Sequence, residues 1–257
     1  MRIARTGDCF WSTRISATAK SDVHRLLFLL GGSEGDILGR VADEFVPAAG
    51  GPDAAIALLL MGGPGWRDHA PEYTAPWMDR SARRHHVIVP DDQGKLDLEA
   101  ASARIAEATG IFIGGGHTPT YHRLYASEPI RSLIRERHQQ GVPVAGLSAG
   151  ALIAPAICMM QTRAPGEPPT RSEVGLGLVS EVIVDVHFDQ PGRLGHLLAT
   201  MIGTRTSLGF GVGVSAGIVF DNGVFARAIG GPAYRVTMTD FTAPLYAIEP
   251  LSDPPPA

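Results

Sequence analysis

Residues 142–154 read VPVAGLSAGALIA, an apolar run that ends at a serine flanked by small residues and is followed directly by a second apolar run. This order predicts a buried strand, a sharp turn and a helix, with Ser148 at the apex of the turn. Small neighbours allow the backbone a strained conformation, and the helix presents unpaired N–H groups at the same point. The pattern favours a nucleophile elbow; the alternative is an ordinary turn in which the serine caps the helix.

The chain before this serine alternates short apolar runs with helical patterns. Such alternation predicts parallel βαβ units in one doubly wound sheet. The early strands end at glycine clusters, and ligands bind outside the carboxyl ends of the strands in such sheets, where these loops collect. The expected strands are residues 25–30, 54–61, 86–90, 110–113 and 142–146, and the expected helices are residues 98–108 and 120–139.

The chain after the serine has a different pattern. Residues 161–173 are rich in Pro, Thr and Arg and are expected to form a loop, and the Pro-rich tail at 250–257 is expected to be disordered. No linker or repeat divides the chain, so one domain is expected over residues 1–257, with residues 1–20 as an extension. The expected strands are residues 178–188, 211–220, 224–229, 233–237 and 245–248, and the expected helix is residues 193–202.

Composition limits the class of protein. The 257 residues are 44% apolar, with a net charge of −4 and no basic block, so neither nucleic acid nor a membrane is expected as a partner. Residues 1–20 lack the apolar segment of a signal peptide, and no apolar stretch is long enough to span a bilayer. Two cysteines give no disulfide framework, and Cys158 is expected to be buried in an apolar helix. The expected location is the cytoplasm.

A serine hydroxyl needs a base, and His187 is the best candidate among the nine histidines. It ends the expected strand in Asp185-Val186-His187-Phe188, and strand ends are where α/β sites assemble. Because side chains alternate along a strand, Asp185 and His187 are expected to face the same way and to supply a base with an orienting carboxylate. The alternative is a strand-end histidine whose ring bonds to backbone carbonyls.

Two groups of backbone N–H donors are candidates for an oxyanion hole. Gly114, Gly115 and Gly116 end the strand expected beside the serine strand, and Ala149 follows the serine at the helix start. The glycine run lacks the spacing and the Lys-Ser/Thr ending of a phosphate-binding loop. His117 follows the glycines and is a candidate for substrate binding or for capping a helix. The chain contains no HExxH or CxxC, and neither a metal nor a cofactor is expected.

These residues resemble those of the S51 serine peptidases, which include cyanophycinase and the aspartyl dipeptidase called peptidase E. Three stretches carry the resemblance: FIGGGHT at 112–118, GLSAGA at 146–151, and DVHF at 185–188 continuing to RLGHL at 193–197. The resemblance implies a three-layer flavodoxin-like α/β sandwich with a mostly parallel central sheet, related to class I glutamine amidotransferase domains. It also implies a homodimer as a candidate assembly, since family members often pair.

The resemblance further implies roles for individual residues. Ser148 would be the nucleophile, His187 the base, and Gly115 and Ala149 the oxyanion donors. Asp185 and His117 fall at positions that contact substrate in the cyanophycinase branch, and cyanophycinases usually carry glutamine where His117 stands. Of three arginine positions after the catalytic histidine, Pro191 and His196 occupy two and Arg193 the third. Gly114, Gly116, His117 and Arg193 are therefore the expected substrate-binding residues. The expected activity is cyanophycinase-like or dipeptidase-like, although only one of the three arginines that cyanophycinases carry is present.

The chain departs from the family at the third catalytic group. Cyanophycinases carry an Asp-Glu pair after a Gly-Ile-Gly-Ile segment, where this chain has GVGV at 211–214 followed by Ser-Ala. The dipeptidase branch places its acid near the position of Arg163. Either Asp185, Glu167 or Glu173 substitutes, or Ser148 and His187 act as a dyad.

The expected function is therefore a serine hydrolase that cleaves a peptide or isopeptide amide through an acyl-enzyme formed by Ser148 with His187 as the base. The expected substrate is a short peptide or an acidic dipeptide-like amide. One alternative is a catalytically weakened or non-enzymatic member of the same fold that binds a small ligand or peptide. Another is an α/β-hydrolase esterase, which is disfavoured because its base histidine usually lies near the chain end.

Overall fold

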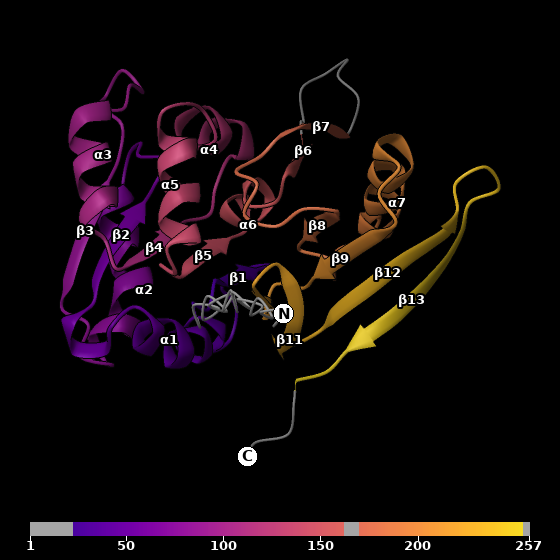
Figure 1. Cartoon of the computed structure of the whole chain (residues 1–257), viewed down its shortest axis with the longest axis horizontal. Coiled ribbons are helices and arrows are strands. Elements are labelled where there is room, and N and C mark those ends of the chain that lie inside the picture. The colour runs from indigo at the N-terminus through magenta and orange to yellow at the C-terminus, as the bar shows by residue number, and fades with distance from the viewer. Residues whose placement is uncertain (1–22, 162–169, 254–257) are drawn as a thin grey trace, which may run out of the picture.

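The computed structural model describes residues 23–161 and 170–253 and arranges them around a central sheet of seven strands, with two smaller sheets beside it (Figure 1). The central sheet has the strand order β11-β10-β1-β5-β4-β2-β3. The strands β1 to β5 run parallel to one another. The strands β10 and β11 follow them at one edge of the sheet, where β10 pairs antiparallel with both β1 and β11. The parallel strands are β1 (Leu26–Leu30), β2 (Ala55–Leu59), β3 (Arg84–Ile88), β4 (Gly110–Ile113) and β5 (Val144–Leu147), and the antiparallel ones are β10 (Ala216–Asp221) and β11 (Val224–Gly230).

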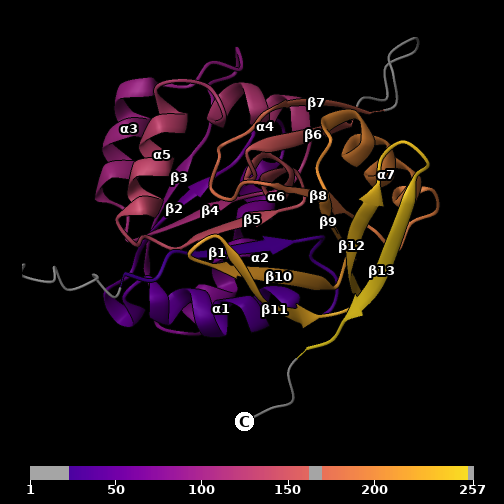
Figure 2. The same cartoon turned by 45° about the vertical axis from the view of Figure 1, so that its right-hand side comes forward.

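Helices cover both faces of this sheet, because apolar side chains alternate between its two sides. In β1, Phe28 and Leu30 belong to one core, and Leu27 and Leu29 belong to the other. Figures 1 and 2 show α1 and α2 on one side of the sheet, and α3, α4 and α5 on the opposite side. The predicted three-layer α/β sandwich with a mostly parallel sheet is confirmed. The helices are α1 (Ile37–Ala48), α2 (Trp66–Met78), α3 (Leu98–Glu107), α4 (Thr118–Tyr125), α5 (Ile130–Gln139) and α6 (Ala149–Ile153).

A second sheet of four strands, in the order β13-β12-β9-β8, lies beyond β10 and β11, at the end of the molecule away from α3 (Figure 2). Its strands β8 and β9 are parallel and are joined by a helix, and β12 and β13 form an antiparallel hairpin. We call it the outer sheet. Its elements are β8 (Val182–Val186), α7 (Arg193–Thr204), β9 (Leu208–Val212), β12 (Ala233–Asp240) and β13 (Leu245–Leu251).

Two predicted elements are each divided in the structure. The helix predicted for 120–139 is two helices, α4 and α5, because Pro129 lies between them and a proline ring disfavours helix in the residue before it. The strand predicted for 211–220 belongs to two sheets. Val212 ends β9 in the outer sheet, and the chain turns at Gly213, whose carbonyl accepts a hydrogen bond from the Ala216 N–H at the start of β10.

The prediction of a loop over residues 161–173 is wrong at the C-terminal end of this range, which forms a strand. β6 (Ile157–Gln161) and β7 (Thr170–Val174) pair antiparallel, and residues 162–169, with Arg163 and Glu167, lie outside the described residues. Cys158 is buried as predicted, but it lies in strand β6 rather than in a helix. An isolated short apolar run does not distinguish a buried strand from a buried helix.

The predicted disorder of the tail is wrong for residues 250–253. Pro250 and Leu251 belong to β13, and the Asp253 carboxylate accepts a hydrogen bond from the Gly230 N–H at 3.3 Å and pairs with Arg40. A proline is tolerated here because β13 is the edge strand of its sheet. In the part of the chain that the structure describes, no helix is both long and apolar enough to cross a membrane.

Candidate active site

Ser148 lies at a strained turn between β5 and α6. Its φ of 49° and ψ of −106° are unusual for a residue with a side chain, and such strain persists only where the surroundings hold it. Its N–H donates to the Leu30 carbonyl of the neighbouring strand at 2.9 Å. A Cβ on Gly150 would lie 2.3 Å from the Ile113 carbonyl oxygen, so only glycine lets α6 approach β4 this closely. The predicted strand, turn and helix are therefore present, with the serine side chain at the carboxyl end of the sheet.

The structure brings His187 to this serine. Its Nε2 lies 2.8 Å from the Ser148 Oγ, although 39 positions separate the two in the chain. Ser148 directly follows β5 of the central sheet, whereas His187 directly follows β8 of the outer sheet, so the pair forms between the ends of strands from two sheets. A nucleophile and a base at this separation have the geometry of nucleophilic catalysis.

The ring of His187 is half-buried, and its environment favours the neutral form. Burial lowers the pKa of His187 below its ordinary value of 6.5, while the charges of Asp189 and Glu34 act in the opposite direction. An imidazole with a lowered pKa is neutral at neutral pH and can accept a proton. Nε2 accepts the serine hydrogen only in the tautomer in which Nδ1 carries the ring hydrogen.

The two carboxylates near His187, those of Glu34 and Asp189, lie on separate loops that both form hydrogen bonds with the backbone of Val214. The Glu34 N–H donates to the Val214 carbonyl at 3.1 Å, and the Val214 N–H donates to the Asp189 Oδ1 at 3.2 Å. Glu34 also lines a cavity of about 400 Å³ together with Ser148 and His187. The sequence analysis did not identify Glu34 or Asp189. A signal for Glu34 exists, because it follows the glycines at the carboxyl end of β1, the strand beside the serine strand.

Gly115 lies directly against the serine. A Cβ on Gly115 would be 3.3 Å from the Ser148 Cβ, and Gly115 lines the same cavity as the serine. Burial raises the pKa of Tyr73 above its ordinary value of 10.0, and a hydrogen bond with the Gly115 backbone acts in the opposite direction, so a neutral phenol lies beside this glycine. Ala149 is the first residue of α6, where helix N–H groups have no partner within the helix. Both predicted oxyanion residues are therefore next to Ser148.

The other two glycines of the run differ in position. The Gly114 N–H donates to the Leu59 carbonyl at 2.9 Å, and its carbonyl accepts from the Gly150 N–H at 3.2 Å, so Gly114 fixes the glycine loop to β2 and to the elbow. Gly116 has a φ of 147° and lines a second cavity at Ser148.

This second cavity, of about 370 Å³, contains the predicted residue His117. His117 is exposed, and its Nδ1 lies 3.0 Å from the Thr120 Oγ1 at the start of α4. His187, Ser148 and Leu152 line the same cavity. His117 is thus placed where it can contact a bound molecule, while also occupying the N-cap position of α4.

Asp185 and Arg193 are placed differently from the prediction. The strand ends at Val186 and His187 has a φ of 52°, so side-chain alternation does not extend to His187, and the prediction that Asp185 shares its face is wrong. Asp185 is 0% exposed and pairs with Arg193, which is 7% exposed. Neither belongs to the described residues that line the two cavities at Ser148. This buried pair joins β8 to the start of α7.

Of the other candidate acids, Glu173 is in β7, opposite Cys158, and pairs with Arg171 at 3.5 Å. Glu167 is outside the described residues. Within residues 23–161 and 170–253, no group of three His, Cys, Asp or Glu side chains is arranged to hold a metal ion.

Comparisons with known proteins identify the family to which the chain is similar. The model of peptidase family S51 matches residues 89–219, a segment that contains both Ser148 and His187. The cyanophycinase of Synechococcus elongatus is 28% identical over 236 residues, which cover 89% of this chain and 73% of that protein. The cyanophycinase of Geminocystis herdmanii (strain PCC 6308) is 29% identical over 226 residues, covering 86% of this chain and 82% of that protein.

Two solved structures share the fold. The crystal structure of a peptidase from an acI-B1 Actinobacterium superposes with a TM-score of 0.62 at 16% identity and covers 86% of this chain and 93% of that chain. That of a putative peptidase E protein from Listeria monocytogenes EGD-e has a TM-score of 0.56 at 14% identity and covers 81% of this chain and 99% of that chain. At these identities the likeness supports the fold alone.

Proposed function

Because the chain belongs to peptidase family S51, we propose that Ser148 and His187 cleave a peptide or isopeptide amide through a covalent acyl-enzyme. Family membership and the cyanophycinase relatives make the chain a serine-type peptidase. The observation that carries the proposed mechanism is the distance of 2.8 Å between the Ser148 Oγ and the His187 Nε2. Cavities of about 370 and 400 Å³ meet at this serine and leave room for a peptide on either side of it.

In the proposed acylation step, the Ser148 Oγ attacks the amide carbonyl carbon while its proton passes to the His187 Nε2. The oxygen of the tetrahedral intermediate receives hydrogen bonds from the N–H groups of Gly115 and Ala149. The C–N bond then breaks, and the His187 proton goes to the leaving nitrogen. In deacylation, His187 takes a proton from water, the hydroxide attacks the ester carbonyl, and the proton returns to Ser148 as the acid product leaves.

Asp189 and Glu34 support the imidazolium in this proposal, in place of a buried triad acid. Their negative charges favour the protonated ring that forms during both steps, and both are on loops tied to Val214. Both side chains are exposed, so water and salt screen them, and their effect is smaller than that of a buried carboxylate. Asp185 is not assigned this role, because it is fully buried against Arg193.

A fluorophosphonate probe tests the proposal without knowledge of the substrate. We expect it to modify Ser148, with an inactivation rate that rises with pH and reaches half its maximum below pH 6.5, because burial lowers the pKa of His187 and only the neutral ring accepts the serine proton. Mass spectrometry of proteolytic fragments locates the label, and stopped inactivation assays give the pH profile. A label on another residue, or a midpoint above pH 6.5, contradicts the proposal.

The variants Asp189→Asn and Glu34→Gln test the supporting charges by the same pH profile. We expect each to move the midpoint to lower pH, since removing a negative charge disfavours the protonated ring, and the double variant to move it further. High salt should shrink these shifts. Glu107→Gln, an exposed carboxylate on α3, is the matched control and should leave the midpoint in place. A loss of about 10⁴-fold in turnover from either single variant would instead assign that residue as an orienting acid.

A further inference from the structure

A cavity of about 810 Å³ lies where the central and outer sheets meet. Its walls come from the first residues of β8 and β9, from the hairpin of β10 and β11, and from β6 and β12. Val182 begins β8 and lines this cavity, whereas His187 follows the last residue of β8 and reaches Ser148. The cavity, which we call the inter-sheet cavity, is therefore at the opposite end of β8 from the candidate active site.

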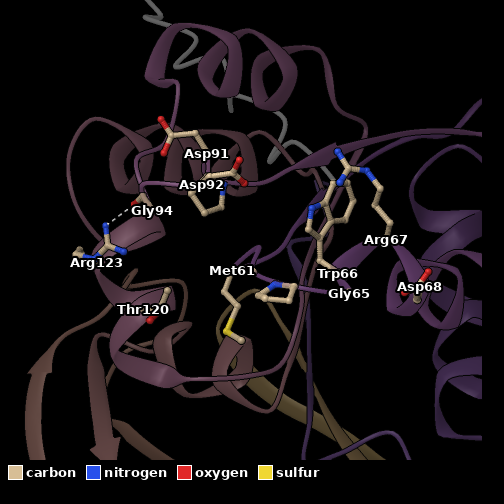
Figure 3. A pocket seen from close by; sticks show the side chains of 13 residues that line it. Met61, Gly65, Trp66, Arg67, Asp68, Asp91, Asp92, Gly94, Thr120 and Arg123 are labelled. Carbon is tan, nitrogen blue, oxygen red and sulfur yellow. Dashed lines mark hydrogen bonds between the residues drawn. The ribbon is translucent and has the colours of Figure 1, made fainter.

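The inter-sheet cavity is separate from the cavities that continue the candidate active site. One of those, of about 650 Å³, lies at the loops after β2 and β3 and contains Met61 and Trp66 (Figure 3). It shares these two residues with a cavity of about 320 Å³ that reaches Gly115, beside Ser148. Among the described residues, none that lines the inter-sheet cavity lines any of these, so it needs an explanation of its own.

Three phenylalanine rings from the two sheets form an aromatic wall of the inter-sheet cavity. Phe210 of β9 stacks on Phe225 of β11 with ring centroids 5.1 Å apart, and it meets Phe220 of β10 edge-on at 5.4 Å. Phe210 and Phe220 are buried, but Phe225 is only half-buried, and Val224 beside it is 69% exposed. Apolar surface is thus left open where the sheets meet, and covering it with the apolar part of a ligand is favourable.

Positive charge lines the cavity beside these rings. Arg205 and Arg235 line it against one carboxylate, that of Glu181. The Arg235 guanidinium lies 4.9 Å from the centroid of the Phe225 ring, and its Nη1 lies 3.4 Å from the Glu249 Oε2. Both partners of this ion pair are partly exposed, so the pair is weak and Arg235 keeps donors for an anion. A guanidinium beside an aromatic face fits a ligand with a carboxylate at one end of an apolar body.

The second arginine is held at a strained backbone position. Arg205 ends α7 with a φ of 54°, where glycine is the usual residue, and Glu181 across the cavity has a φ of 61°. The Arg205 guanidinium lies 5.5 Å from the centroid of the Phe241 ring, and no carboxylate of the described residues pairs with it. Strained residues gather at ligand sites, and this one presents a cation without an anionic partner at the cavity.

We propose that the inter-sheet cavity binds a small amphipathic carboxylate, with its apolar body on the rings of Phe225 and Phe210 and its carboxylate on Arg205 and Arg235. The volume of about 810 Å³ and the apolar wall with a few charged groups are typical of small-molecule sites, which span about 300–1,000 Å³. A ligand here contacts both sheets and therefore stabilises the chain in which they are docked. The inference does not depend on the reaction proposed at Ser148.

Isothermal titration calorimetry with three compounds of one skeleton tests the class of ligand. We expect 4-phenylbutanoate to bind with a Kd about tenfold below that of 4-phenylbutanol, and 4-phenylbutylamine to bind most weakly, because the charge of the cavity wall favours an anion. The carboxylate should raise the melting temperature, and high salt should weaken its binding. Equal affinity for the three compounds, or a preference for the amine, overturns the proposal.

Variants of the two arginines connect binding to the cavity. Arg205→Gly and Arg235→Gln should each raise the Kd of 4-phenylbutanoate by about tenfold. Because glycine relieves the positive φ, Arg205→Gly should not lower the melting temperature of the free protein, which separates a loss of binding from a loss of folding. Arg104→Gln, an exposed arginine on α3, is the matched control and should leave the Kd unchanged. An unaltered Kd in both cavity variants overturns the site.

Charge placed at the exposed position 224 gives a test that does not disturb packing. Val224→Asp should raise the Kd of 4-phenylbutanoate and Val224→Lys should lower it, and Glu181→Gln should also lower it, because a charge of the same sign as the ligand is removed. Leu98→Asp, at an exposed apolar residue that begins α3, is the control. The same Kd in the Asp and Lys variants, or weaker binding in Glu181→Gln, contradicts a carboxylate bound in this cavity.

Discussion

Replacing Ser148 with alanine is expected to lower kcat/KM for any amide substrate by roughly 10⁴- to 10⁶-fold. The variant lacks the only atom that can form the acyl-enzyme in the proposed mechanism, while His187 and the backbone donors at Gly115 and Ala149 stay in place. The Cβ of the serine is kept, and with it the contacts that hold the strained turn against β1 and β4. Activity should therefore fall without a matching fall in thermal stability. Initial rates over a substrate series, together with thermal unfolding, measure both.

The matched control is Ser132→Ala, which removes an exposed serine hydroxyl on α5. It should keep full activity. Ser148→Ala should also still bind peptide, since the cavities around it are unaltered, and bound peptide should raise the melting temperature. Hydrolysis that survives in Ser148→Ala at the original rate would remove the basis of the proposed mechanism.

The second large effect is expected for His187→Asn. Asparagine tolerates a positive φ better than most residues, and His187 has a φ of 52°, so this substitution removes the base with little backbone strain. A serine without its base is a poor nucleophile, and the loss should again be roughly 10⁴- to 10⁶-fold in turnover. Turnover measured in the single variants and in the double variant tests whether the two residues act as a unit.

The double variant Ser148→Ala/His187→Asn should be no slower than either single variant, because residues that act as one unit have non-additive effects. His24→Asn is the control for the loss of an imidazole, since His24 is exposed, precedes β1 and pairs with Asp221. If the two losses multiplied in the double variant, each residue would contribute independently, and a shared proton transfer would be excluded.

The central half of the fold could be predicted because its signals are local. Four of the five parallel strands, all but β3, are short buried runs followed by glycine or a polar turn, and the elbow is encoded within residues 142–154. The outer sheet was harder, because Val212 and Ala216 belong to one continuous apolar run and yet enter different sheets. Only tertiary pairing, such as the Gly213 N–H with the Pro232 carbonyl, decides where that run divides.

The candidate site shows the same limit. Ser148 and His187 could be found from the elbow and from a histidine at a strand end. Glu34 has a signal in its position after the glycines that follow β1. Asp189 has none, because it is an exposed loop residue with no periodic pattern, and the hydrogen bonds through Val214 bring the two loops together. The orienting role predicted for Asp185 depends on a strand that continues through His187. The strand instead ends at Val186, because His187 has a positive φ.

The division of the reacting pair between two sheets has a consequence for when the enzyme becomes competent. Ser148 and the parallel strands around it lie within the first 148 of the 257 residues, whereas His187 arrives only with β8 and the strand that pairs with it. A nascent or partly unfolded chain can thus have an ordered elbow and still lack the base that peptidase activity requires. We therefore expect peptidase activity to require docking of the outer sheet, and local unfolding of that sheet to abolish activity even where the elbow stays folded.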